Sequence, residues 1–340
     1  MPHWPKTKSL IITAVVMVGL LAAVVLVTRP STRIAIKETL LASGNLPRAN
    51  TPVLSSEPIR IPKSNAEVYA AQQGQSAVSL VALSRATGDP AWLQRAVELH
   101  PEDPRVQLER WHVAKTPEEK ALAVAALRAA APNNPLGHYL ASQQAFKSKD
   151  LGAVANLLVD ASFVNDFSNY TTEVLGETES AFRASGLNEA DALMAAFSVS
   201  VNFSAETTAS LGQLGNDIGD LQHVFVEMGY WDEADFLLEQ SLTLGEQLQG
   251  SGLIIDNLVG IALQRKLLSS FDPETIIDWN GTRASERLQQ LDADLGNIKT
   301  ITESAVGAIG SLDADGLAKY RTILLSDGEL AAMRWLKERK

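Results

Sequence analysis

His100-Pro-Glu-Asp-Pro104 recurs as Ala131-Pro-Asn-Asn-Pro135, 31 residues further along the chain. In both copies the first proline cannot continue a helix, and the second proline follows an Asp or an Asn. An Asp or Asn side chain can accept hydrogen bonds from the free N–H groups of a first helical turn, where proline also fits because it has no N–H. Each copy therefore predicts the end of one helix and the capped start of the next.

Two more pairs of a capping residue and a proline, Asp89-Pro90 and Thr116-Pro117, predict two further helix starts. The four starts lie 14, 13 and 18 residues apart. This spacing leaves room for helices of roughly 10–14 residues, joined by short turns that make successive helices antiparallel. A two-helix period in the low thirties is typical of helical-repeat solenoids. We therefore predict an all-α fold, a solenoid of antiparallel helical hairpins.

The segment Leu221–Leu242, which contains MGYWDEADFLLEQSL, resembles a tetratricopeptide repeat. Six of its residues stand at motif positions of that family: Leu221 and Phe225 in the first helix, Gly229 between the helices, Trp231 just after it, and Ala234 and Leu238 in the second helix. Ser241 replaces the usual alanine, and the closing proline is missing. Residues 90–161 have closing prolines but lack the usual Trp-x-x-Leu-Gly. The resemblance implies a tetratricopeptide-like fold and a protein-binding role over about half of the chain, and it is silent on any activity.

An apolar run near the N-terminus predicts a membrane anchor. The 18 residues Leu10–Val27 (LIITAVVMVGLLAAVVLV) carry no charge. With one flanking residue on each side, residues 9–28 reach the roughly 20 residues that a membrane-spanning helix needs. The alternative is a cleaved signal peptide, but the run exceeds the usual apolar core of about 7–15 residues and no Ala-x-Ala follows it. We expect a basic tail (1–8), an anchor (9–28) and a proline-rich stalk (29–64).

Two features of the sequence predict opposite orientations of the chain in the membrane. Lys and Arg are slightly more numerous after the span, which favours a cytoplasmic C-terminal domain. A short basic tail before one early span favours export, and large domains translocate largely regardless of charge. We expect a single-pass protein of a bacterial cytoplasmic membrane, with a cytoplasmic N-terminus and an exported C-terminal domain. The absence of cysteine fits either side of that membrane.

Charge separates the N-terminal part from the rest. Residues 1–63 hold eight Lys or Arg and two acidic residues, whereas the remainder holds 21 basic and 38 acidic residues, a formal charge of −17. Such an acidic body repels phosphate backbones, so we expect no nucleic-acid partner.

The remaining boundaries follow from changes in the helical pattern. Residues 65–268 read as the repeat domain, irregular in 163–216, and residues 269–340 as a C-terminal helical region. Gly212, Gly215 and Gly219 form a row at helical spacing that predicts close packing of two helices. Asp272-Pro-Glu274 and Ser326-Asp-Gly-Glu329 predict two further capped starts. A long helix over 283–309 carries an apolar stripe that packs onto the solenoid or against a second copy.

Candidate chemistry is sparse. None of the five histidines pairs with another at a helical zinc spacing, and Asp313-Ala-Asp-Gly316 lacks the closing Glu of a calcium loop. We therefore expect no catalytic, cofactor or metal site, and no enzymatic activity. In helical-repeat families the first helices of the hairpins line a concave surface, which gives four candidate groove residues for a protein partner: Arg105, Glu109, His112 and His138.

Three functions remain open from the sequence. The leading hypothesis is a membrane-anchored scaffold that recruits or stabilises a protein complex at a bacterial envelope membrane. The second is a self-associating structural spacer, assembled through the 283–309 helix. The third is an exported hydrolase or lyase that uses carboxylates in a helical cleft.

Overall fold

The computed structural model describes residues 59–340 except 279, 306–307, 310–311 and 340. The predicted tail and anchor, and most of the predicted stalk, lie outside the described residues. Within them the fold is all-α, as predicted, with fourteen helices and one isolated bridge between Ile276 and Arg283. No helix among the described residues is both long and apolar enough to span a bilayer.

Seven short helices form the first part of the domain. They are α3 (Lys63–Gln72), α4 (Ala77–Thr87), α5 (Pro90–Leu99), α6 (Pro104–Val113), α7 (Pro117–Ala130), α8 (Leu136–Ser148) and α9 (Leu151–Ser162). The predicted capping residues start four of them. Asp89, Asp103 and Thr116 accept from N–H groups of the first turns of α5, α6 and α7. Asn134 accepts from the N–H of Leu136 at the start of α8. These helix starts are confirmed.

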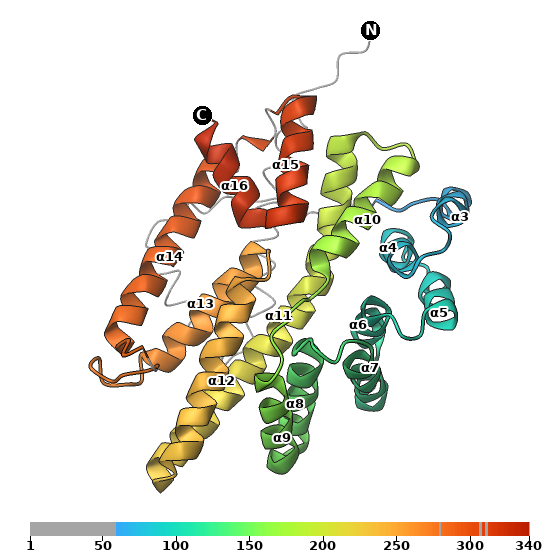
Figure 1. The fold of residues 1–340 in the computed structure, drawn as a ribbon. Coiled ribbons are helices and arrows are strands. Elements are labelled where there is room, and N and C mark those ends of the chain that lie inside the picture. Colours follow the sequence, from blue (N-terminus) through green and yellow to red (C-terminus); the bar gives the residue numbers. More distant parts are fainter. Residues whose placement is uncertain (1–58, 279, 306–307, 310–311, 340) are drawn as a thin grey trace, which may run out of the picture.

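The short helices pack as consecutive antiparallel hairpins, α4 with α5, α6 with α7 and α8 with α9 (Figure 1). Neighbouring hairpins touch through α5 and α6 and through α7 and α8. This repeat-like stack agrees with the predicted solenoid. The first helices α4, α6 and α8 share one side of the stack, because all three contact the same later helix.

That later helix is α11 (Glu189–Met228), which follows α10 (Thr171–Ala184) after a turn at residues 185–188. It has 40 residues, so at 1.5 Å per residue it is about 60 Å long. The Asn188 side chain caps it by accepting from the N–H of Asp191. The stretch that looked irregular in the sequence, 163–216, is therefore a loop, α10 and the first two thirds of α11.

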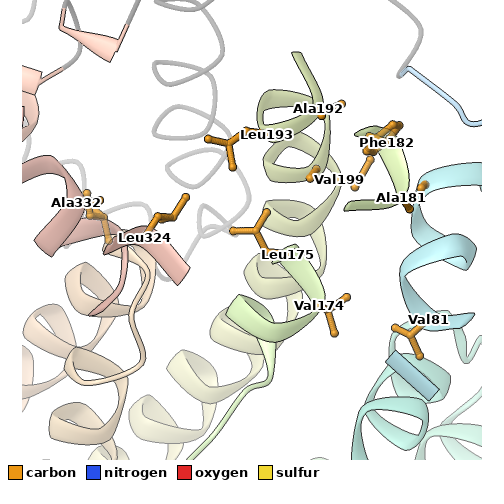
Figure 2. Packing of buried hydrophobic residues seen from close by; sticks show 14 of the residues in the cluster. Val81, Val174, Leu175, Ala181, Phe182, Ala192, Leu193, Val199, Leu324 and Ala332 are labelled. Carbon is orange, nitrogen blue, oxygen red and sulfur yellow. The ribbon is translucent and has the colours of Figure 1, made fainter. Parts of the chain in front are cut away.

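Helix α11 joins the two hydrophobic clusters of the domain. Its N-terminal half contributes Ala192, Ala196 and neighbours to a cluster with α3–α5, α10 and the C-terminal helices. Figure 2 shows this part of the core, where Phe182 of α10 lies close to Ala192 and Val199 of α11. Its C-terminal half contributes Leu211, Leu214 and Ile218 to a cluster with α6–α9 and α12.

The predicted glycine row lets two helices approach closely. Helix α12 (Trp231–Gln249) folds back along α11, and α13 (Ile254–Leu268) packs against both. A Cβ atom at Gly215 would lie 2.8 Å from Leu263 Cδ2, and one at Gly212 would lie 3.2 Å from Val259 Cγ1. Both neighbours belong to α13, so the interpretation of the row as a packing surface is confirmed.

Helices α14 (Ala284–Ala305), α15 (Ala314–Asp327) and α16 (Glu329–Glu338) complete the fold. The apolar stripe of α14 faces the chain's own core, with Leu291, Ile298 and Ala305 buried against α13 and α16. The Asp313 side chain caps α15 by accepting from the N–H of Gly316, 2.8 Å away, as a capped turn requires.

One predicted helix start in this region is wrong, and one predicted capping box is wrong although a helix does begin at Glu329. No helix begins at Asp272-Pro-Glu274, because the carbonyls of Pro273 and Thr275 accept from the N–H groups of Ser285 and Ala284 and hold the segment as a folded loop. Ser326 lies inside α15 and does not cap α16. The Glu329 carboxylate instead accepts from the N–H of Ile254 at 3.0 Å, and so caps the remote helix α13.

Candidate partner-binding surface

The side of the stack formed by the first helices is covered by the chain's own α10 and α11. Arg105 of α6 pairs with Glu173 of α10 at 3.1 Å. The Nε2 atom of His112, also on α6, lies 2.8 Å from the Thr207 hydroxyl of α11. Two of the four predicted groove residues therefore contact elements of the same chain. Binding of a protein partner through these residues stays a prediction.

The third predicted residue, Glu109, belongs to a buried ionic cluster with Arg85 and His112. The Nε and Nη2 atoms of Arg85 donate to Glu109 Oε2 at 2.9 and 2.7 Å. His112 Nδ1 lies 3.6 Å from the same oxygen, and the Glu109 residue is only 1 % exposed. Phe203 of α11 closes the cluster, with its ring centre 4.3 Å from the Arg85 guanidinium carbon.

The charges in this cluster decide the protonation of its carboxylate. Burial alone would raise the pKa of Glu109, but the charge of Arg85 and the nearby His112 outweigh burial and hold that pKa below its usual value. Glu109 is thus an ionised partner of Arg85 and is unsuited to donate a proton as a general acid. The arrangement fastens α4, α6 and α11 to one another.

The fourth residue, His138 on α8, lies apart from this cluster. Its Nδ1 atom is 3.8 Å from Asp160 of α9, and Arg128 of α7 also pairs with Asp160. Burial lowers the pKa of His138, Arg128 acts in the same direction, and Asp160 opposes both. Of the four predicted residues, the structure brings only Glu109 and His112 together in one cluster.

Large exposed hydrophobic side chains reveal a surface that sequence reasoning missed. Most of them are single residues scattered over the helices, which is normal for a protein surface. Four gather within eight residues where α11 turns into α12: Val224 is 46 % exposed, Met228 61 %, Tyr230 50 % and Trp231 61 %. We call residues 221–236 the hairpin tip. It lies at the end of the molecule remote from α15 and α16 (Figure 1).

The shape of the hairpin tip is set by its turn. Gly229 ends α11 with φ +79°, a left-handed conformation that glycine adopts without a steric cost. The half-buried ring of Phe225 meets the ring of Tyr230 edge to face, with centres 6.1 Å apart. The sequence held a signal for this surface, because Val224 and Met228 add apolar residues outside the buried face of α11.

Metal-ligand groups and cavities add no further candidate site among the described residues. Among the residues described, no three His, Asp or Glu side chains are grouped so that they could hold a metal ion. A shallow cavity at the turn between α10 and α11 has Arg183 and Glu189 in its wall, but these two residues pair with each other at 3.2 Å. Comparisons of the chain with protein-family models, with curated proteins and with solved structures find no match.

Proposed function

We propose that this protein is a membrane-anchored scaffold that recruits or stabilises a protein complex at a bacterial envelope membrane. In this proposal residues 9–28 anchor the chain in the cytoplasmic membrane, residues 29–64 are a stalk, and the helical domain is exported. The domain is proposed to be a tetratricopeptide-like solenoid, which the stacked hairpins and the turn at Gly229 support.

The observation that carries the proposal is the hairpin tip. Monomeric proteins rarely expose contiguous large apolar groups, and exposed groups of this kind mark contact sites for other molecules. Aromatic residues and methionine are enriched in protein interfaces, and the hairpin tip exposes two aromatic residues, Tyr230 and Trp231, and one methionine, Met228. Because α11 covers the first helices, we assign partner binding to the hairpin tip in preference to the concave surface.

The test uses the full-length chain with a C-terminal tag, cross-linked in its native membrane and then purified. Three forms are compared: the wild type, a Met228→Ser/Trp231→Ala double variant, and a Phe163→Ser control. Phe163 is 80 % exposed and lies outside the hairpin tip, so the control removes a comparable apolar group elsewhere. Mass spectrometry identifies and quantifies the proteins that are recovered together with the chain.

A stoichiometric partner that is recovered with the wild type and the control, and is lost with the double variant, is the expected result. Recovery of the chain alone, at a discrete multiple of its own mass, would replace the scaffold by a self-associating spacer. Equal recovery of a partner from all three forms would show that the hairpin tip is not the binding surface.

A further inference from the structure

The charge distribution around the hairpin tip identifies the chemistry of its partner. Residues 184–264 contain twelve Asp or Glu and no Lys or Arg. This segment includes all of α11 and α12 and most of α13. The hairpin tip therefore belongs to a segment, which we call the arm, whose formal charges are all negative, and the basic residues Arg265 and Lys266 follow it directly in the last turn of α13.

Four acidic residues lie next to the exposed apolar residues in the sequence of the hairpin tip. Glu227 lies one position before Met228, and Asp232, Glu233 and Asp235 follow Trp231 in the first turns of α12. All four are exposed, and none takes part in an ion pair of the described residues. The ion pair closest to them in sequence joins Asp220 of the arm to Lys266 of α13 at 3.7 Å. We call Glu227, Asp232, Glu233 and Asp235 the acidic rim.

The helix dipole explains only part of the acidic rim. Carboxylates in the first turn of α12 are favoured by the partial positive charge of a helix N-terminus, which accounts for Asp232 and Glu233. Glu227 lies instead in the last turn of α11, where the dipole favours a cation. The helix dipole therefore does not account for the position of Glu227 beside the apolar residues.

We propose that the hairpin tip docks a cationic amphipathic segment of a partner protein. The apolar face of that segment covers Met228, Tyr230 and Trp231, and its Lys and Arg side chains face the acidic rim. Methionine adapts to irregular apolar surfaces, and exposed tryptophan and tyrosine rings also attract cations through their faces. This inference rests on the proposed scaffold function and specifies the partner that it binds.

The same charges argue against other occupants. An anionic lipid surface would be repelled by the acidic rim, although an apolar tip alone would insert into it. A second copy of the tip would bring two acidic rims together, which costs binding energy. A cationic segment is the occupant whose charge complements the whole surface.

The test uses synthetic probe peptides of about 18 residues with leucine at helical spacing, so that each can form an amphipathic helix. One peptide carries lysine on its polar face, and a matched peptide carries glutamate. The protein is the full-length chain in nanodiscs of uncharged phosphatidylcholine. Binding is measured by fluorescence anisotropy at low and high salt, and hydrogen exchange locates the amides that the peptide protects.

Two variants and two controls test the surface. Trp231→Ala removes the largest exposed ring, and Glu227→Gln/Asp232→Asn/Glu233→Gln removes three rim charges. The matched controls are Phe163→Ser for the apolar change and Glu98→Gln/Glu102→Gln/Glu118→Gln for the charge change. The control glutamates are exposed and lie outside the arm.

The lysine peptide should bind the wild type and both controls, and it should slow exchange in residues 221–236. Trp231→Ala and the rim variant should each weaken binding by at least about tenfold, and high salt should weaken binding to the wild type by a similar factor. Equal binding of the glutamate peptide, or equal loss in the charge control, would overturn the inference. A cross-link in the isolated chain from position 231 to residues 29–58, or to a second copy of the chain, would also overturn the inference. It would show that the hairpin tip binds a segment of this protein and not a partner protein.

The two proposals can fail separately. If cross-linking in the membrane recovers a tip-dependent partner but the lysine peptide does not bind, the scaffold function stands and the cationic chemistry is wrong. If the lysine peptide binds the tip but no partner is recovered from the membrane, the cationic chemistry stands and the scaffold function is wrong.

Discussion

We expect Asp256 to make the stability of this domain depend on pH near neutrality. Its side chain is wholly buried near the start of α13, where it accepts hydrogen bonds from Asn169 and Ser251 at 2.9 and 2.7 Å and from the Thr208 hydroxyl. All three donors are uncharged. Burial therefore dominates and raises the pKa of Asp256 to about 6, although the hydrogen bonds act in the opposite direction.

The carboxyl group of Glu329 titrates in a similar pH range and interacts electrostatically with Asp256. Burial raises its pKa to about 7, the hydrogen bond from the Ile254 N–H opposes that rise, and the Asp256 charge adds to it. The two carboxyls influence each other, so they titrate as a pair. Their pKa values exceed those of the unfolded chain, so the folded state binds protons more tightly. Their stabilising contribution is complete below about pH 4 and is lost as the pH rises through about 6 to 7.

The magnitude follows from the pKa of Asp256. One pKa unit corresponds to about 1.4 kcal/mol. A rise from 3.8 to about 6 therefore corresponds to roughly 3 kcal/mol in the free energy of unfolding that is present in acid and absent in base. Asp256→Asn keeps the shape and removes this titration. We expect the variant to lose roughly 3 kcal/mol of the pH dependence that the wild type shows between about pH 4 and pH 8.

The assay is urea unfolding of the full-length chain in uncharged nanodiscs over a series of pH values, followed by circular dichroism. The measured quantity is the difference in unfolding free energy between variant and wild type at each pH. Contributions from groups that do not interact with Asp256 cancel in this difference, and only the coupled Glu329 also changes. Asp232→Asn, an exposed aspartate, is the control and should leave the pH profile unchanged. A parallel pair of profiles for Asp256→Asn and the wild type would refute the reasoning.

Two further variants test the packing of α11. Glu109→Gln leaves the Arg85 charge buried without its counterion and should lower the free energy of unfolding by about 3–5 kcal/mol, whereas Arg85→Met/Glu109→Leu should cost much less. Urea unfolding measures both, and equal losses would contradict a buried ion pair. Gly215→Ala places a methyl group against Leu263 and should cost about 1–3 kcal/mol, measured as a lower Tm. In Gly219→Ala the new Cβ would lie 3.6 Å from Leu267 Cδ1, an ordinary van der Waals contact. This variant should be neutral or stabilising, because alanine has a higher helix propensity than glycine.

The sequence predicted the helices of the stack because capping is local chemistry. Each capping side chain bonds to an N–H group two or three residues away, so a short pattern such as Thr116-Pro-Glu-Glu119 contains all that the helix start needs. The same pattern misled at Ser326–Glu329, because the N–H group that Glu329 satisfies belongs to Ile254, 75 residues earlier. A partner this far away in the sequence leaves no trace in local spacing.

The candidate site was less accessible to sequence reasoning for the same reason. Glu109 and His112 were predicted on the correct helix, but their partners Arg85 and Thr207 are 24 and 95 residues away. Only the tertiary fold shows that α11 covers this side of the stack. The hairpin tip was found as a turn, through Gly229, but its exposure depends on how far α11 extends beyond its neighbours.

The length of α11 has a consequence for how this architecture can change. Ordinary helical-repeat arrays are open-ended, because each repeat contacts only its neighbours and one more can be added without disturbing the rest. Here a single helix contacts the first helix of all three hairpins and enters both hydrophobic clusters. An added hairpin would have no part of α11 to pack against. Deletion of a hairpin would expose the apolar residues of α11 that now pack against it. The length of α11 therefore limits the number of hairpins that the domain can hold. We expect related proteins of this fold to differ in their surface residues and to keep the same number of hairpins.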